Sequence, residues 1–196
     1  MTDAKSQPVQ EPGAAHRAVK QASAWVARFA GLVPAQGQVL DLACGGGRHS
    51  RLFLARGHPV TAVDIDLSGI ADLAGHPRLE TLEVDLEDGR AFPLAGRRFA
   101  GVVVTNYLYR PLVADLVAAV APGGVLIYET FARGNERFGK PRNPAHLLDP
   151  GELLDAVRGR LRVLAYEDLT VDRPRPAAVQ RICAVKEEAV NEEEAP

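Results

Sequence analysis

The chain has 196 residues, a length that fits one globular domain with tails rather than several domains. Hydrophobic residues make up 46% of the chain and charged residues 24%, which excludes a wholly disordered, collagen-like or low-complexity protein. The formal net charge of −2 argues against a dedicated nucleic-acid-binding protein. Five glutamates and no basic residue lie within 187–196, so the remaining residues carry a net charge of +3.

Polar termini flank the predicted domain. We expect a flexible leader over 1–14, a folded domain over 15–186 and a solvated acidic tail over 187–196. No apolar run approaches the ~20 residues of a membrane span, and the N-terminus lacks the apolar stretch of a secretory signal. Cys44 and Cys183 lie in contexts typical of reduced thiols. We therefore expect a soluble, cytoplasmic protein.

Short apolar segments alternate with helical stretches along this domain. The expected strands, in chain order, are 38–42, 60–64, 79–84, 99–105, 125–129, 161–168 and 179–185. The expected helices are 16–32, 48–56, 112–120 and 150–157. We expect Pro122-Gly123-Gly124 to stop the third of these helices, and Asp149 to cap the fourth, with Pro150 at its first position.

The last two strands are separated by only ten residues, and Pro174 and Pro176 leave no room there for a helix. These strands therefore pair as an antiparallel hairpin. The whole pattern predicts an α/β fold: a doubly wound, Rossmann-like, seven-stranded sheet that is mostly parallel, with an antiparallel terminal hairpin.

The most informative segment is VLDLACGGGRHS at 39–50, in which a strand runs into a glycine-rich turn and then into a helix. Glycine lets the backbone approach a ligand closely and adopt positive φ angles. The amides at the start of the helix favour an anionic group. Asp41, near the end of this strand, can receive an ammonium group directly or through water.

Acidic residues end the next two strands as well. Asp64 ends the strand VTAVD, where a carboxylate can accept both hydroxyls of a ribose. Asp85 follows the third strand, where it can accept a hydrogen bond from an adenine amino group. Each feature alone also fits a cap or a solvated loop, but the three in order at consecutive strand ends favour a binding site.

This combination resembles the class I S-adenosylmethionine-dependent methyltransferases over residues 16–186, with VLDLACGGGRHS as the strongest motif. The segments CGGGRH, VTAVDID and GKPRNPAHLLDPGELL make it similar to the small tellurite-resistance-type and thiopurine-type bacterial members. The resemblance implies S-adenosylmethionine as cofactor and a sheet that ends in an antiparallel hairpin. The residues that it assigns to the cofactor are Asp41, Ala43, Cys44, Gly45, Gly47, Arg48, Asp64, Ile65, Asp85, Leu86 and Thr105.

The resemblance also implies that the methyl acceptor lies at the end of the fourth strand. The candidate catalytic residues there are Asn106, Tyr107, Tyr109 and Arg110. Because this segment holds no His, Asp or Glu, we expect no obligatory general base. The same tyrosines also fit a half-buried loop with their phenol tips in water. We expect His49 to lie on a helix face rather than to act in catalysis.

A second wall of the acceptor site is expected after the fifth strand. Its candidate substrate contacts, with one more from the first helix, are Trp25, Tyr128, Arg133 and Arg137. The segment 133–142 is basic and has glycines that can serve as the hinges of a lid. It also fits a solvated loop, and Trp25 also fits ordinary core packing.

Composition and motifs favour a small-molecule acceptor with a soft or anionic nucleophile, such as a thiol, a chalcogen oxyanion or a carboxylate. Methylation of RNA or protein and a non-catalytic cofactor-binding scaffold remain alternatives. A nicotinamide-dependent oxidoreductase is less favoured, because Ser50 stands where that glycine pattern needs its third glycine. The histidines show no metal-ligand spacing, so no metal is expected, and the sequence leaves the oligomeric state open.

Overall fold

The structure, a computed structural model, describes residues 21–188. The predicted leader, the start of the first expected helix and most of the acidic tail lie outside these residues. The strands are β1 (Val39–Leu42), β2 (Val60–Asp64), β3 (Leu79–Glu83), β4 (Phe99–Thr105), β5 (Val120–Phe131), β6 (Arg162–Val171) and β7 (Ala177–Val185). The α-helices are α2 (Ala24–Phe29), α3 (Arg48–Ala55), α4 (Arg110–Ala118) and α5 (Glu152–Val157). The 3₁₀ helices are η1 (Ala30–Leu32), η2 (Leu67–Leu73), η3 (Asn135–Arg137) and η4 (Pro144–His146).

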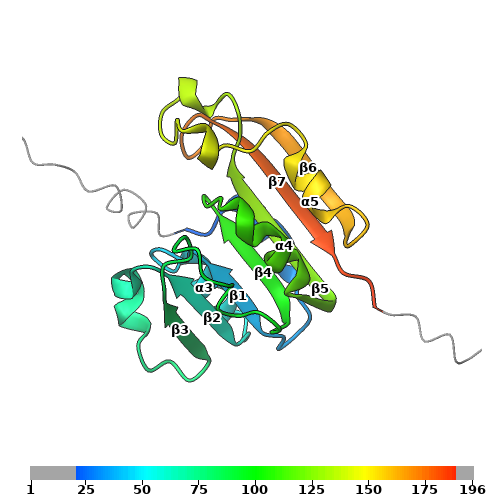
Figure 1. Cartoon of the computed structure of the whole chain (residues 1–196). Helices are drawn as coiled ribbons and strands as arrows, with labels where there is room; N and C mark the ends of the chain where they lie inside the picture. The colour runs from blue at the N-terminus through cyan, green and yellow to red at the C-terminus, as the bar shows by residue number, and fades with distance from the viewer. Residues whose placement is uncertain (1–20, 189–196) are drawn as a thin grey trace, which may run out of the picture.

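The seven strands form one sheet in the order β3-β2-β1-β4-β5-β7-β6 (Figure 1). Strands β1 to β5 pair in parallel, whereas β7 is antiparallel to both β5 and β6. The predicted doubly wound sheet with a terminal antiparallel hairpin is therefore confirmed. Because β1, β2, β4 and β5 are parallel, their carboxyl ends meet at one edge of the sheet, and the predicted site residues lie along that edge.

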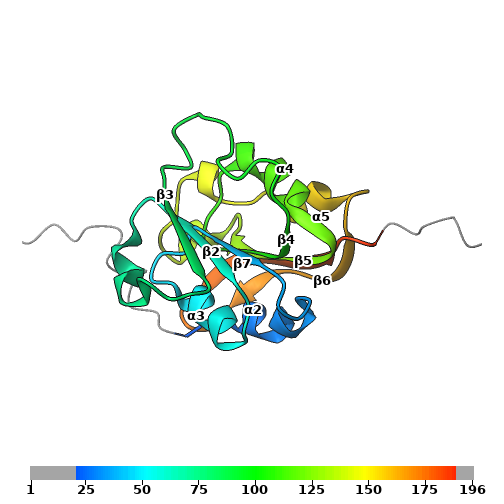
Figure 2. The same ribbon diagram turned by 90° about the horizontal axis from the view of Figure 1, so that it is seen from below.

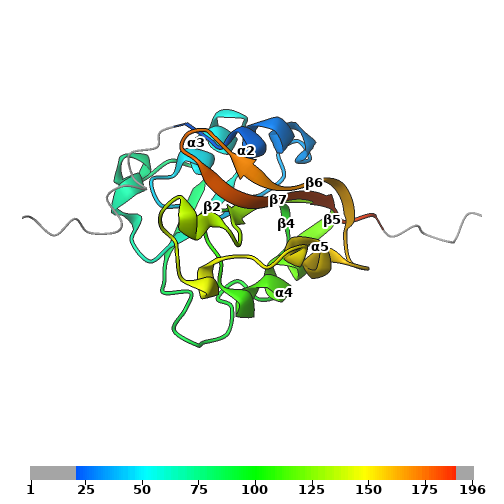
Figure 3. The same cartoon turned by 90° about the horizontal axis from the view of Figure 1, so that it is seen from above.

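Helices cover both faces of the sheet, so the domain has three layers. Helices α2 and α3 lie on one face, and α4 and α5 lie on the other (Figures 2 and 3). The core under α2 and α3 contains Trp25, Phe53 and Ile127. The core under α4 and α5 is larger and includes Leu116 and Leu126. Strands buried on both faces explain the continuous apolar runs in the sequence.

The region around Pro122 differs from the prediction. Helix α4 begins at Arg110 and ends at Ala118, and β5 already begins at Val120, so Pro122-Gly123-Gly124 lies inside a strand. A Cβ atom built on Gly124 would lie 2.9 Å from the Phe99 carbonyl oxygen. Glycine therefore lets β5 approach β4 closely at this irregular start, and it does not serve as a helix stop.

The start of α5 is a second correction. The helix begins at Glu152, and its N-cap is Gly151 in the left-handed region at φ 77°, so Asp149 is not the cap. Asp149 instead pairs with Arg133 through a contact of 2.7 Å, and its amide donates to the Glu152 carboxylate. The chain turns at the glycine, which adopts this backbone conformation at little cost.

Trp25 belongs to the core, which corrects its expected role as a substrate contact. Its side chain is only 2% exposed, and its indole N–H donates to the Ile182 carbonyl over 3.2 Å. The guanidinium of Arg181 lies 4.9 Å from the ring centroid. A side chain enclosed in this way fixes α2 on the sheet and presents no free face to an acceptor.

Both cysteines are free and buried, as the sequence predicts. Burial raises the pKa of the Cys44 thiol, so this residue stays protonated and behaves as a small apolar group. Within residues 21–188, no helix combines the length and the apolar character needed to cross a membrane.

The packing of Trp25 predicts a stability effect. Trp25→Phe removes the bond to Ile182 and part of the ring volume, so it should lower the free energy of unfolding by ~1–3 kcal/mol. Urea denaturation measures this change. Unchanged stability together with a changed KM for an acceptor would restore Trp25 to the acceptor site.

Candidate active site

The glycine turn after β1 is a tightly wound loop. Ala43, Gly45 and Gly47 all have positive φ angles, of 52°, 51° and 68°. A Cβ atom on Gly47 would lie 2.2 Å from the Ile70 side chain in η2, so only glycine fits there. A Cβ atom on Gly45 would meet nothing within 4 Å among residues 21–188. The turn is therefore packed on one side and open at Gly45, as a loop that receives a ligand must be.

Asp41 holds the start of α3 in place. Its carboxylate accepts hydrogen bonds from the Ser50 amide at 2.8 Å and from the Ser50 hydroxyl at 2.6 Å. Helix α3 needs this partner, because its N-cap is Gly47, which has no side chain to accept from the first amides. Burial raises the pKa of Asp41 to about 6, even though both bonds from Ser50 act in the opposite direction.

Asp64 ties the end of β2 to the glycine turn. One carboxylate oxygen accepts from the Gly45 amide at 2.7 Å and the other from the Asp66 amide at 3.1 Å. A carboxylate has about four lone-pair sites, so two amide bonds leave room for the hydroxyls of a ribose. The structure thus brings Asp64 beside the turn, as the motif order predicts.

The predicted adenine-binding residues lie at the neighbouring strand ends. Ile65 follows β2 and is 64% exposed, a high value for an isoleucine. Leu86 is buried, whereas Asp85 is exposed and accepts from the Glu87 amide at 2.8 Å. An apolar surface at Ile65 and an acceptor at Asp85 suit the face and the edge of a purine, and both assignments stay predictions.

A row of polar side chains, which the sequence did not reveal, crosses the sheet at this edge. Thr105 on β4 is paired with Glu129 on β5, Glu129 with Arg181 on β7, and Arg181 with Glu167 on β6. Arg181 donates to Glu129 at 3.3 Å and to Glu167 at 2.7 Å. Ile127, two residues before Glu129, belongs to the core under α2 and α3, so the row points to that face.

Arg48 and His49 join this row from the start of α3. Arg48 donates to the Thr105 hydroxyl at 3.2 Å, and burial lowers the pKa of its guanidinium. The Nε2 atom of His49 accepts from the Ser23 amide at 3.2 Å, so the ring proton is on Nδ1, which lies 3.5 Å from Thr105. Burial lowers the pKa of His49 to about 3, which keeps the ring neutral.

Ser23 connects α2 to the row. Its hydroxyl donates to Glu129 at 2.7 Å and accepts from the amides of Trp25 and Val26. Ser23 is therefore both the N-cap of α2 and a hydrogen-bond partner of the Glu129 carboxylate on β5. Sequence reasoning missed Ser23 and Glu129, although the serine directly before a helical stripe was a usable capping signal.

The end of β4 places its candidate residues in different directions. Asn106 is exposed, with φ 56°, and its backbone N–H donates to the Glu129 carbonyl. Tyr107 packs against the core under α4 and α5, and its hydroxyl is buried without a hydrogen-bond partner among the described residues. Burial raises the pKa of Tyr107, and the nearby Glu87 raises it further. Tyr107 thus faces the loop after β3, and of these two residues only Asn106 is exposed at the end of β4.

Tyr128 and Arg110 are held in structural contacts. Tyr128 is buried and donates to the Tyr107 carbonyl at 3.0 Å, so its expected substrate contact is not supported. Arg110 makes two bonds to the Glu152 carboxylate, at 2.7 and 2.8 Å, and donates to the carbonyls of Ala145 and Leu147. Arg110 is thus held by Glu152 and two carbonyls, and its expected anion contact stays a prediction. Tyr109, the residue before α4, is half-buried against the core under α4 and α5.

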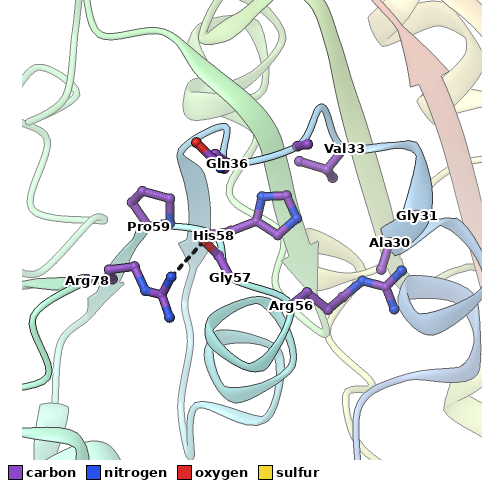
Figure 4. Close-up of a pocket in the computed structure, with 10 residues that line it drawn as sticks. Ala30, Gly31, Val33, Gln36, Arg56, Gly57, His58, Pro59 and Arg78 are labelled. Atoms are coloured by element: carbon purple, nitrogen blue, oxygen red, sulfur yellow. Dashed lines mark hydrogen bonds between the residues drawn. The ribbon is translucent and has the colours of Figure 1, made fainter.

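A hollow of about 760 Å³ lies at the opposite edge of the sheet, near the amino ends of β1 and β2 (Figure 4). His58 Nδ1 donates to the Gly37 carbonyl at 3.0 Å, and Arg78 donates to the Gly57 carbonyl at 3.3 Å. These bonds hold the turn that follows α3. The hollow is separated from the glycine turn by the length of the strands and takes no part in the candidate site.

The raised pKa of Asp41 predicts a pH-dependent stability. The folded chain binds this proton more tightly than the unfolded chain, so the contribution is present below about pH 4 and is lost as the pH rises through about 6. Relative to Asp41→Asn, the free energy of unfolding of the wild type should fall by ~2–3 kcal/mol between about pH 4 and 7. Urea denaturation across this range tests the effect, with Asp115→Asn on α4 as an exposed control. Parallel curves for all three proteins would contradict it.

The unpartnered hydroxyl of Tyr107 predicts a stabilising substitution. Tyr107→Phe removes a buried polar group that lacks a partner, so the free energy of unfolding should stay equal or rise by up to ~1 kcal/mol. Thermal and urea denaturation measure this change. A loss of more than ~1 kcal/mol would mean that the hydroxyl makes a stabilising bond.

The sequence is similar to those of known methyltransferases. Residues 39–124 match the model of a methyltransferase-domain family. Malonyl-acyl-carrier protein O-methyltransferase of Salmonella typhimurium is 33% identical over 134 residues, which are 62% of this chain and 53% of that protein. The chain spans about half the length of the curated relatives that it matches.

Solved structures share the fold. TehB of Haemophilus influenzae has a TM-score of 0.64 at 18% identity, over 83% of this chain and 61% of that one. The 1,6-didemethyltoxoflavin-N1-methyltransferase of Burkholderia thailandensis, solved with S-adenosylhomocysteine, has a TM-score of 0.62 at 21% identity, over 84% of this chain and 77% of that one. The chain therefore shares the Rossmann-like fold of these solved methyltransferases, and over residues 39–124 it is similar to a methyltransferase-domain family; it resembles the class I S-adenosylmethionine-dependent methyltransferases.

Proposed function

We propose that the protein transfers the methyl group of S-adenosylmethionine to a small-molecule acceptor with a soft or anionic nucleophile. The observation that carries this proposal is the alignment of the glycine turn, Asp64 and Asp85 at adjacent strand ends, with the turn open at Gly45. The family match over residues 39–124 supports the same cofactor.

The residues present fit this cofactor. The open side of Gly45 leaves room for the carboxypropyl part beside the first amides of α3. Asp64 retains acceptor sites for ribose hydroxyls, and the exposed Ile65 offers an apolar surface for a purine face. When bound, S-adenosylmethionine supplies a methyl group on a sulfonium, which a nucleophile attacks in line.

Three titratable side chains near the end of β4, on the face under α2 and α3, are not free to act as a base. His49 is neutral, and its Nε2 is occupied by the Ser23 amide. Glu129 is engaged by Ser23 and Arg181, and Asp41 is enclosed with Ser50. From these three groups, an acceptor that attacks on this face gains proximity and orientation but no proton acceptor. A nucleophile that is soft or already anionic fits this environment.

An anionic oxygen is one such nucleophile. The curated relatives are named as O-methyltransferases of malonyl-acyl-carrier protein, and they match 62% and 72% of this chain. Arg48 adds a partly buried positive charge, with a single hydrogen bond, near the end of β4. Both observations favour a carboxylate over a neutral amine.

Calorimetry with S-adenosylhomocysteine tests the proposal. Binding should be 1:1, and Asp64→Ala should weaken it on the order of 10–100-fold, because a charge-assisted hydrogen bond is lost. Asp115→Ala, an exposed change on α4, serves as the control. Tight NADH binding with no affinity for S-adenosylhomocysteine would overturn the cofactor assignment, and methylation of RNA or protein alone would overturn the acceptor class.

A further inference from the structure

Two loops lie side by side at the carboxyl end of β5. The segment 133–149 follows β5, and the turn 172–176 joins β6 to β7 (Figures 1 and 3). The Ala132 amide donates to the Ala178 carbonyl at 2.9 Å. A small separate core lies beneath both loops and consists of Phe131, Leu147, Ala177 and Val179. The loops therefore form one surface.

The base of the longer loop is fixed by several bonds. Ala132 and Leu148 form a parallel bridge, so the two ends of the loop are joined. Arg110 binds the Leu147 carbonyl at 2.9 Å from the α4 side. Gln180, which is fully buried on β7, donates to the Asp149 carbonyl at 2.6 Å. The exposed part of the loop thus stands on a well-connected base; its predicted motion as a lid stays a prediction.

Most of the exposed charged side chains on this surface are positive. We call five of them the cationic rim: Arg137, Lys140, Arg142, Arg173 and Arg175. No ion pair involves them within residues 21–188. The two loops also hold three acidic residues. Asp149 pairs with Arg133, Glu136 accepts a hydrogen bond from the Gly134 amide, and the third acidic residue is Asp172.

The cationic rim differs in this respect from the rest of the described chain. Most arginines outside it bind a carboxylate, as Arg97 binds Glu80 and Arg181 binds Glu167. Like charges on one surface repel one another, so guanidinium and ammonium groups without a carboxylate partner favour an anion there. Arginine is also suited to bidentate binding of a carboxylate or a phosphate.

The position of the cationic rim relative to β4 sets a distance. Neighbouring strands in a sheet lie ~4.8 Å apart, and β5 and then β7 follow β4 in the sheet order. The register places Thr105 level with Glu129 and Arg181, whereas β5 runs two residues further to Phe131 and β7 begins four residues further at Ala177. At ~3.4 Å per residue along a strand, the longer loop begins roughly 8 Å from the end of β4, and the turn 172–176 begins roughly 17 Å from it. Under the proposed function, the end of β4 is where the acceptor atom receives the methyl group.

We propose that the cationic rim binds an anionic group of the acceptor, a carboxylate or a phosphate, which lies roughly 10 Å or more from the methylated atom. The inference rests on the proposed function and narrows its acceptor to molecules with a remote negative charge. Arg137, Lys140 and Arg142 act in specificity, because they touch a part of the acceptor that does not react. Their loss raises KM and leaves kcat unchanged.

The binding test uses inorganic pyrophosphate as the probe and calorimetry on the protein saturated with S-adenosylhomocysteine. The triple variant R137Q/K140Q/R142Q should bind pyrophosphate at least ~10-fold more weakly than the wild type. The control R98Q/R158Q/R160Q removes the same charge from exposed positions elsewhere and should bind as the wild type does. Equal affinity in the two triple variants, or no binding to the wild type, overturns the cationic rim as an anion site.

A turnover arm links the anion site to the acceptor. In an assay of S-adenosylhomocysteine release, acceptors with a second anionic group should be preferred over their methyl esters, and R137Q/K140Q/R142Q should abolish that preference through KM. A preference that persists in this variant overturns the inference. Pyrophosphate titration repeated without S-adenosylhomocysteine keeps the result separate from the proposed function, which fails on its own if S-adenosylhomocysteine does not bind.

Discussion

A buried carboxylate at the end of β1 is the interaction on which the site depends. Asp41 replaces the side-chain cap that α3 lacks, because a glycine must occupy the N-cap position for the turn to close. The turn, the first amides of α3 and Arg48 thus keep their places through two bonds to Ser50. Burial of a carboxylate costs free energy, and the chain accepts this cost where a ligand-binding loop needs a fixed helix start.

Next to Asp41, the strand ends bring charged side chains together in pairs of opposite sign. The row from Thr105 to Glu167 alternates hydroxyl, acid, base and acid across four strands, with Ser23 bound to its central acid. Each charged member has a partner, so the row orders α2 and α3 against the sheet without supplying a free proton acceptor. Arg48 is the exception, since within residues 21–188 its hydrogen bond goes to a hydroxyl, while the carboxylates of Glu129 and Asp41 act on it without a direct bond.

Periodic and motif-bearing features were predictable from the sequence, whereas long-range partners were not. Strand β4 was predicted to the residue, because an apolar run bounded by polar residues is a local signal. The contacts of Tyr107 and Arg110 were not predictable, since they are set by loops that the sequence does not position. The role of Glu129 could not be predicted, because its partner Arg181 is set by the register between β5 and β7. The prediction that Pro122-Gly123-Gly124 stops a helix was wrong, because such a segment can also lie in an irregular strand.

The packing between the glycine turn and η2 has a consequence for redesign. A Cβ atom on Gly69 would lie 2.8 Å from the Gly45 carbonyl oxygen, just as one on Gly47 would overlap Ile70. Two segments more than twenty residues apart are thus fitted to each other by the absence of side chains. Anyone who transplants the turn into another scaffold must carry Gly69 and Ile70 with it, since the portable unit is this pair of segments and not the motif alone.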